Sequence, residues 1–231
     1  MSLIPSVPGV PALHWLNGVS GDAVLNEEGV LLTIRTGKET DWFNPPPAPS
    51  ESSSTGTAAV PAGLSNAPAL VFAAPPSTDW QFSALVQVNH QYLFDAGTLF
   101  LHQGANDWCK LCFEYSPEKR PLVVSVVTRD VSDDANGATI DGSSVYLRIS
   151  KVGSMIAFHY ALTNKDDNSN NNNNNNNQRY WTLHRAFCMR NPDAPTSIGF
   201  LAQAPTGVSC TAHFSSMGFS RTTLGDLRDG S

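Results

Sequence analysis

Three side chains that could take part in ligand binding stand at alternate positions within residues 108–115, which read W-C-K-L-C-F-E-Y. If this segment is a β-strand, alternation places Trp108, Lys110 and Glu114 on one face and the apolar residues between them on the other. An aromatic ring, an ammonium and a carboxylate on one surface suit a sugar, because the sugar ring stacks on the aromatic group while its hydroxyls form hydrogen bonds. The pattern therefore favours a binding face for a polar ligand.

Residues 145–150 (V-Y-L-R-I-S) repeat this arrangement, because apolar and polar side chains alternate and Arg148 points away from the core. We predict that Glu114 and Arg148 share one concave surface. Three further residues are expected at or near it: Asp95, Thr128 and Trp181.

A simpler alternative is that this face only contacts solvent, as one side of an antiparallel sheet normally does. Pairs such as Glu114–Arg148 or Lys110–Asp95 would then be surface ion pairs that contribute little to stability.

A glycoside hydrolase of the same fold is the catalytic alternative. Hydrolysis of a glycosidic bond needs two carboxylates that face each other across it, about 5 to 10 Å apart. Glu114 is the only acid on its strand, and Asp41 or Asp95 could become its partner only through the tertiary fold. We therefore predict no catalytic residue and favour a binding role over an enzyme.

Residues that could bind a metal are scattered. The histidines stand singly, and Cys109 and Cys112 (C-x-x-C) lie within an alternating strand, so their thiols point to opposite faces. We expect free, packed thiols rather than a zinc or redox site. Only the acidic segment 132–137 (S-D-D-A-N-G) leaves a structural calcium open. We predict no metal ligand and no cofactor.

Short strand-like segments supply the elements that must position these side chains. They span residues 30–36, 82–90, 97–103, 108–115, 122–128, 145–150, 155–162, 180–185, 197–202 and 210–217. Many are separated by Gly, Pro or Asn-Asp turns, and no segment shows a long apolar stripe of helical period. The sequence therefore predicts a single all-β domain over residues 1–231, a two-sheet antiparallel jelly-roll sandwich.

Two segments interrupt this pattern. Residues 44–69 are rich in Pro, Ser and Ala and have no periodicity, which predicts a long exposed loop insertion. Residues 164–178 include eight consecutive asparagines, 170–177, which predict a disordered hairpin loop.

The charge balance excludes several classes of partner. The formal net charge is −6 and there is no run of Lys or Arg, so we expect neither nucleic-acid nor membrane binding. The N-terminal residues 1–15 lack a basic start and a continuous apolar run, so we expect no signal peptide and a cytoplasmic protein.

Several motifs resemble those of one family. In chain order they are T-D-W-F (40–43), D-A-G-T-L-F-L (95–101), W-C-K-L-C-F-E-Y (108–115), V-V-T (126–128), S-D (132–133), Y-L-R (146–148) and W-T-L-H-R (181–185). This order, over about residues 30–216, is similar to an uncharacterised concanavalin-A-like family named after "regulation of enolase". The resemblance implies a jelly roll of the lectin and glucanase type, and it implies no reaction. Asp134 stands where that family has the Trp of S-D-W, so the rim of the surface is expected to differ.

These observations predict a non-catalytic binding or regulatory domain that holds a polar ligand, such as a carbohydrate, on a concave sheet face. The predicted ligand-binding residues are Asp95, Trp108, Lys110, Glu114, Thr128, Arg148 and Trp181. The alternatives are a glycoside hydrolase-like enzyme and a regulator that acts through a protein partner of unknown identity.

Overall fold

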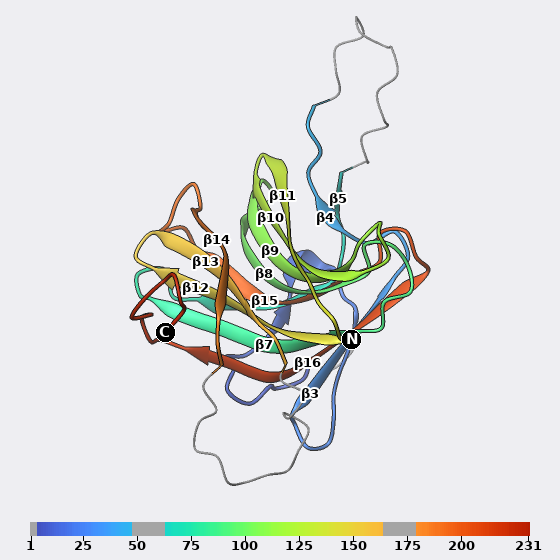
Figure 1. The fold of residues 1–231 in the computed structure, drawn as a ribbon, viewed down its shortest axis with the longest axis horizontal. Helices are drawn as coiled ribbons and strands as arrows, with labels where there is room; N and C mark the ends of the chain where they lie inside the picture. Colours follow the sequence, from blue (N-terminus) through green and yellow to red (C-terminus); the bar gives the residue numbers. More distant parts are fainter. Residues whose placement is uncertain (1–3, 48–62, 164–178) are drawn as a thin grey trace, which may run out of the picture.

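The computed structural model describes residues 4–47, 63–163 and 179–231, and these form two seven-stranded antiparallel sheets packed face to face (Figure 1). In these ranges the only helix is the 3-10 turn η1, Leu16–Gly18, and no helix is long and apolar enough to cross a membrane. The predicted all-β sandwich is therefore confirmed.

Sheet A has the order β1-β6-β15-β8-β9-β10-β11. Its strands are β1 (His14–Trp15), β6 (Ala69–Ala74), β15 (Thr196–Gln203), β8 (Ala96–Gly104), β9 (Asp107–Tyr115), β10 (Pro121–Arg129) and β11 (Val131–Thr139).

Sheet B has the order β14-β13-β12-β7-β16-β3-β2. Its strands are β14 (Thr182–Cys188), β13 (Met155–Ala161), β12 (Ser144–Val152), β7 (Trp80–Val88), β16 (Ser209–Ser220), β3 (Leu31–Gly37) and β2 (Asp22–Leu25). A separate two-stranded ribbon pairs β4 (Trp42–Phe43) with β5 (Leu64–Ser65).

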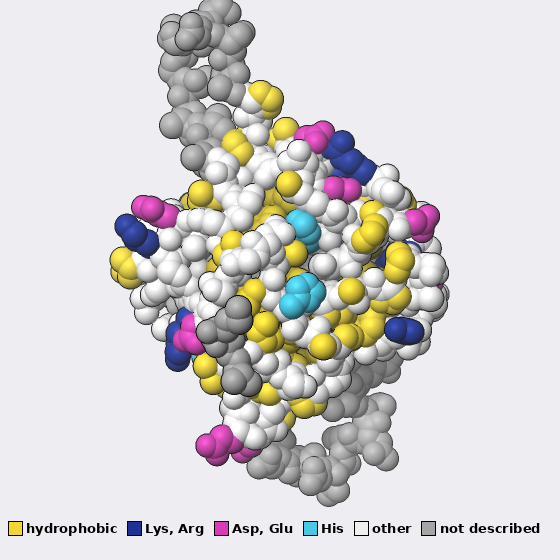
Figure 2. Space-filling view, turned by 180° about the vertical axis from the view of Figure 1, so that it is seen from behind, with side chains coloured by type: hydrophobic (Ala, Val, Ile, Leu, Met, Phe, Trp, Pro, Cys, Tyr) yellow, Lys and Arg dark blue, Asp and Glu magenta, His cyan; other side chains and the backbone are white. Residues whose placement is uncertain are grey.

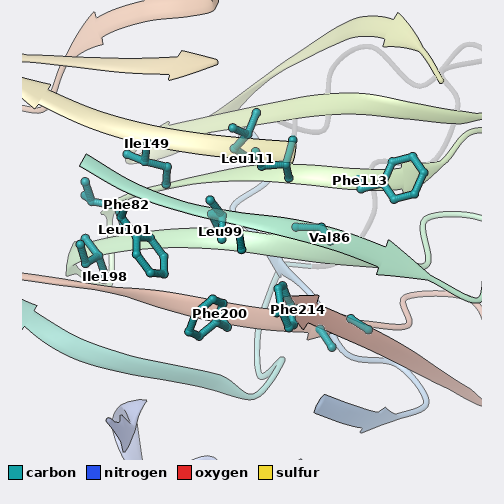
Figure 3. Close-up of a cluster of buried hydrophobic side chains, with 14 of the residues drawn as sticks. Phe82, Val86, Leu99, Leu101, Leu111, Phe113, Ile149, Ile198, Phe200 and Phe214 are labelled. Carbon is teal, nitrogen blue, oxygen red and sulfur yellow. The ribbon is translucent and has the colours of Figure 1, made fainter. Parts of the chain in front are cut away.

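The main core fills the space between the two sheets. Strand alternation sends one set of apolar side chains inward from each sheet, so that Leu99 and Leu111 of sheet A meet Phe82 and Phe214 of sheet B (Figure 3). Aromatic rings contact one another within this layer, where Phe82 lies 5.0 Å from Phe200 between ring centroids. The remaining side chains of each sheet point away from the core, and we call these the outer faces of sheets A and B.

All ten segments predicted as strands are strands. Six further strands have no counterpart among the predicted segments: β1, β2, β4, β5, β6 and β11. Strand β11 reads V-S-D-D-A-N-G-A-T, which resembles a turn because Asp, Asn and Gly disfavour strands. It is nevertheless paired with β10, at the edge of sheet A, where only one neighbour constrains it.

The loop predicted over residues 44–69 is corrected at its end. Leu64–Ser65 forms β5, and β6 begins at Ala69. Ala67 and Ala69 are buried in the apolar group on the outer face of sheet A. Residues 48–62 of the predicted loop, and the whole predicted hairpin loop 164–178, lie outside the described residues.

The predicted separation of the two C-x-x-C thiols onto opposite faces is confirmed. Cys109 packs into the core between the sheets, whereas Cys112 lies on the outer face of sheet A, and both thiols are buried and free. Figure 2 shows one side of the molecule on which Lys, Arg, Asp and Glu are sparse and sit mainly toward the periphery.

Gly97→Ala should destabilise the sandwich, because β8 approaches sheet B too closely there for a methyl group. The added carbon would lie 2.8 Å from Val86 Cγ1 and 2.9 Å from Val88 Cγ2. We expect urea unfolding to show a loss of roughly 1–3 kcal/mol. Gly104→Ala on the same strand is the control, since no described atom lies within 4 Å of its added carbon. Equal stability of the two variants would contradict the close contact.

Candidate functional site

The outer face of sheet A contains a buried lysine with polar partners. Lys110 Nζ donates to Asp41 Oδ1 at 2.7 Å and to Gln203 Oε1 at 2.8 Å. Gln203 Nε2 in turn donates to Phe94 O at 3.1 Å and reaches Glu114 Oε2 at 3.5 Å. We call Asp41, Lys110, Glu114 and Gln203 the Lys110 cluster. Its four side chains come from positions as far apart in the sequence as 41 and 203.

Three elements position the Lys110 cluster. Lys110 and Glu114 alternate on β9, as predicted, and Gln203 ends β15, which lies two strands away beyond β8. Asp41 immediately precedes β4 and is held over sheet A by the Thr40–Ala204 bridge, in which each backbone N–H donates to the other carbonyl. The cluster therefore forms only when the segment before β4 lies across the sheet.

A further carboxylate lies in the same row. Lys110 is opposite Val126 on β10, and Val126 is opposite Asp134 on β11, so Lys110, Val126 and Asp134 face the same side. Asp134 is exposed, whereas Lys110 is 2% exposed. The residue that replaces the expected Trp of S-D-W is thus an acid beside the buried lysine.

Burial and charge act together on the titration of the Lys110 cluster. Burial alone would lower the pKa of Lys110, but the carboxylate of Asp41, which also accepts its hydrogen bond, does most to offset this effect, and the pKa lies above its usual value. Burial raises the pKa of Glu114 to about 8, although Lys110 opposes this shift. The cluster therefore holds a charged ammonium next to a carboxyl that retains its proton near neutral pH.

Trp108 does not form an open stacking platform. It is fully buried in an apolar group on the outer face of sheet A, where its ring lies 5.7 Å from Trp42 and 5.9 Å from Phe100 between centroids. Trp42 Nε1 donates to Ala67 O at 2.9 Å, which fastens β4 to the chain leading into β6. The predicted open binding face is wrong at Trp108, and so is the solvent-facing alternative, because the segments around β4 and β5 cover this ring.

Thr128 acts as part of a structural connection on this face. Its hydroxyl is 2.9 Å from Ser132 Oγ, and Ser132 Oγ accepts a hydrogen bond from Asn44 N at 2.9 Å. This chain of contacts joins the β10–β11 hairpin to the end of β4.

Asp95 lies apart from the Lys110 cluster. It precedes β8 and is fully buried, with Oδ2 accepting hydrogen bonds from Gln91 N and Tyr92 N. The suggested Lys110–Asp95 pair is wrong, because Asp41 occupies the partner position.

Arg148 and Trp181 lie on the other sheet, so the prediction of one shared surface is wrong. Arg148 projects from the outer face of β12 in sheet B, whereas Glu114 is on β9 in sheet A. The guanidinium stacks 4.1 Å from the centroid of Trp181 and donates to Gln81 Oε1 at 3.2 Å. Strand alternation predicted correctly that the side chains of Glu114 and Arg148 point away from the core. It cannot predict which sheet a strand joins.

No metal centre is formed by the described residues, among which no group of three or more His, Cys, Asp or Glu could hold an ion. In the acidic segment 132–137, strand alternation turns Asp133 away from Asp134. Asp133 is instead ion-paired with Arg185 at 2.8 Å.

A family model described as "Protein of unknown function (DUF1349)" matches residues 15–222. The chain belongs to this DUF1349 family. The match does not carry the name "regulation of enolase", so that finer label stays a prediction. No curated protein matches the chain.

Solved structures resemble this DUF1349 chain in fold. A functionally unknown protein from Saccharomyces cerevisiae has a TM-score of 0.68 at 16% identity, with 91% of this chain and 96% of that chain covered. A xylan beta-1,4-xylosidase from Bacillus halodurans C-125 has a TM-score of 0.56 at 10% identity, covering 81% and 32%. The GH43 BlXynB protein from Bacillus licheniformis has a TM-score of 0.52 at 10% identity, covering 67% and 29%. The chain thus spans about a third of these two proteins, and identities this low show the fold alone.

Asp41, Gln203 and Trp42 were not among the predicted site residues. The motif T-D-W-F at 40–43 contains Asp41 and Trp42. Its resemblance to the family pattern, outside any predicted strand, is a signal that could have identified both. Nothing in the sequence singles out Gln203, because a glutamine at the end of a strand is ordinary.

Glu114→Gln should change how stability depends on pH. Between the usual pKa of 4.5 and the folded value of about 8, the unfolded chain has released the Glu114 proton while the folded protein still holds it. The Glu114 contribution to stability is therefore lost as the pH rises through this window, and the variant lacks this contribution. We expect the free energy of unfolding of the variant, measured in urea relative to the wild type, to rise by at least about 1 kcal/mol between about pH 5 and about pH 8.

Glu118→Gln, which changes an exposed glutamate just after β9, is the matched control. A stability difference between Glu114→Gln and wild type that stays constant across this range would show that Glu114 is ordinarily solvated.

Proposed function

We propose that this DUF1349 chain binds a small, hydroxyl-rich polar ligand, for which a carbohydrate is the best fit, at the Lys110 cluster. The observation that carries the proposal is the position of a 2% exposed lysine, with two carboxyl groups and an amide, on the sheet face that points away from the main core.

Stability alone does not account for the Lys110 cluster. Taking an ammonium and a carboxylate out of water costs several kcal/mol for each ion, and apolar side chains of similar volume are often as stabilising as the pair. The neighbouring outer-face positions of sheet A are apolar, including Phe100, Cys112 and Val126. A hydrophobic residue at position 110 would continue that layer, so the presence of a lysine there supports a role in binding.

The chemistry of the Lys110 cluster suits a neutral ligand with several hydroxyls. The Glu114 carboxyl, with its pKa raised to about 8 by burial, can donate a hydrogen bond near neutral pH as well as accept one. Asp41 offers acceptor oxygens, and its side chain is 18% exposed against 3% for Lys110. We infer that a ligand would approach from the Asp41 side, where the cluster is more exposed, and that it would have to be small.

A glycoside hydrolase-like enzyme is the second candidate, favoured by one observation. Asp41 is ion-paired with Lys110, whereas Glu114 holds its proton. Glycoside hydrolysis uses such a pair, with one protonated carboxyl as the general acid and one ionised carboxylate. The fold similarity to a xylosidase adds only the fold, since it covers a third of that protein.

A regulator that acts through a protein partner, as the enolase-regulation label suggests, is favoured less. Lys110 and Glu114 are buried, so a protein surface would contact only Asp41 of the Lys110 cluster.

The proposal is tested by a glycan array and a thermal-shift screen of small metabolites on the wild type, followed by calorimetric titration of each hit. Asp41→Asn removes a charge, and Glu114→Gln replaces a protonated carboxyl by an amide that has no hydroxyl to donate. Both keep the side-chain shape, and we expect each to weaken binding at least about tenfold. Asp22→Asn, which breaks the exposed Asp22–Arg35 pair, should leave affinity unchanged.

Hits that bind equally to all three variants, or no hits at all, would refute binding at the Lys110 cluster. Release of a chromophore from aryl xylosides by the wild type, lost in Glu114→Gln, would replace the binding role by the enzyme.

A further inference from the structure

A second polar group occupies the outer face of sheet B. Arg148 on β12 lies opposite His159 on β13, and Trp181 stacks on the guanidinium. Arg148 is 5% exposed and His159 is fully buried. None of the ion pairs between described residues involves Arg148. A buried guanidinium without a carboxylate is costly, and burial lowers the pKa of Arg148 to about 10.

The C-terminal strap, residues 223–231, covers this group. It folds back over β12 and β13 as the dark red segment beside the label C in Figure 1. Its backbone supplies acceptors in place of an anion, since Arg148 Nη2 donates to Gly230 O at 2.7 Å and His159 Nε2 donates to Leu227 O at 2.8 Å. Two carboxylates of the strap, Asp226 and Asp229, instead accept hydrogen bonds from the strap's own backbone.

The strap leaves several polar atoms unsatisfied. Arg148 Nε, His159 Nδ1 and Ser150 Oγ are buried without a hydrogen-bond partner among the described residues. Ser150 shares the outer face of β12 with Arg148. Because Leu227 O can only accept, the proton of neutral His159 is on Nε2 and Nδ1 is a free acceptor. The group thus offers an unused donor, an unused acceptor and a hydroxyl, which an oxyanion bearing a hydroxyl would satisfy.

Gly230 marks the centre of the group. It is buried with a φ of +71°, and a methyl group added there would collide with the Arg148 guanidinium. The same methyl would lie 2.8 Å from Trp181 Cβ and 3.2 Å from His159 Cδ2. The strap therefore inserts its backbone into the space between these three side chains, and only glycine fits.

The strap also lies beyond the family match, which ends at residue 222. Arg148, His159 and Trp181 fall within the match. The family model therefore includes Arg148, His159 and Trp181 but not the strap that covers them.

We propose that Arg148, His159 and Trp181 form a binding site for a small oxyanion, a carboxylate or a phosphate group, and that the strap fills this site as a displaceable substitute for the ligand. The site lies on the opposite sheet from the Lys110 cluster and does not depend on the function proposed there.

Gly230→Ala tests the proposal in the full-length chain, because its methyl group should expel the strap and open the site. Strap release is read out by trypsin cleavage after Arg228, which should accelerate. Isothermal titration with sodium phosphate and with sodium citrate, at constant ionic strength set by sodium chloride, should then show at least about tenfold tighter binding than in the wild type. Adding Arg148→Gln to this variant should abolish the binding.

Gly225→Ala is the matched control within the strap, because the nearest atom to its added carbon is Ser231 O at 3.5 Å and its φ is not positive. It should behave as the wild type in both assays. Leu224→Ser, which removes the strap's buried apolar anchor, provides a second way to release the strap if Gly230→Ala does not fold.

Binding of phosphate alone would identify a phosphate site, and binding of citrate alone a carboxylate site. The proposal is overturned if the strap is released but neither anion binds more tightly, or if binding survives Arg148→Gln. It is also overturned if trypsin cleaves both strap variants no faster than the wild type, since the strap would then not be displaceable.

Discussion

Burial of the Lys110 ammonium is the constraint on which the outer face of sheet A depends. A charge that is 2% exposed must be compensated within its immediate surroundings. Asp41 and Gln203 provide that compensation, and Asp41 can do so only if the segment before β4 crosses the sheet. The crossing in turn brings Trp42 onto Trp108 and shields the apolar layer of the face. The ion pair, together with the Thr40–Ala204 bridge, thus fixes the path of a segment outside the two seven-stranded sheets.

The outer faces of sheets A and B are alike in arrangement but differ in how the buried charge is compensated. Each carries a buried cation beside a tryptophan, and each is covered by a segment outside the seven-stranded sheets. On sheet A the cover supplies a carboxylate, Asp41, so the charge is matched. On sheet B the cover supplies a peptide carbonyl, that of Gly230, so the charge of Arg148 remains unmatched. This difference is why we propose a neutral polar ligand for the first site and an anion for the second.

Local alternation made much of the structure predictable. It placed Trp108, Lys110 and Glu114 on one face of β9 and separated Cys109 from Cys112, because side-chain direction in a strand depends only on position. The sheet to which Arg148 belongs was not predictable, since sheet order is set by long-range pairing. The partner of Lys110 lies 69 residues away, a contact without local signature. Strand β11 was missed because edge pairing overrode a composition typical of turns.

The central claim is that the Lys110 cluster is a dry, charged site built into the outer face of sheet A. The most direct test is a carbon-13 NMR titration of the side-chain carboxyl of Glu114, assigned by the signal that disappears in Glu114→Gln. The account predicts a midpoint far above the usual 4.5, at about 8, because burial stabilises the protonated form. A midpoint close to 4.5 would show a hydrated carboxylate and contradict the account.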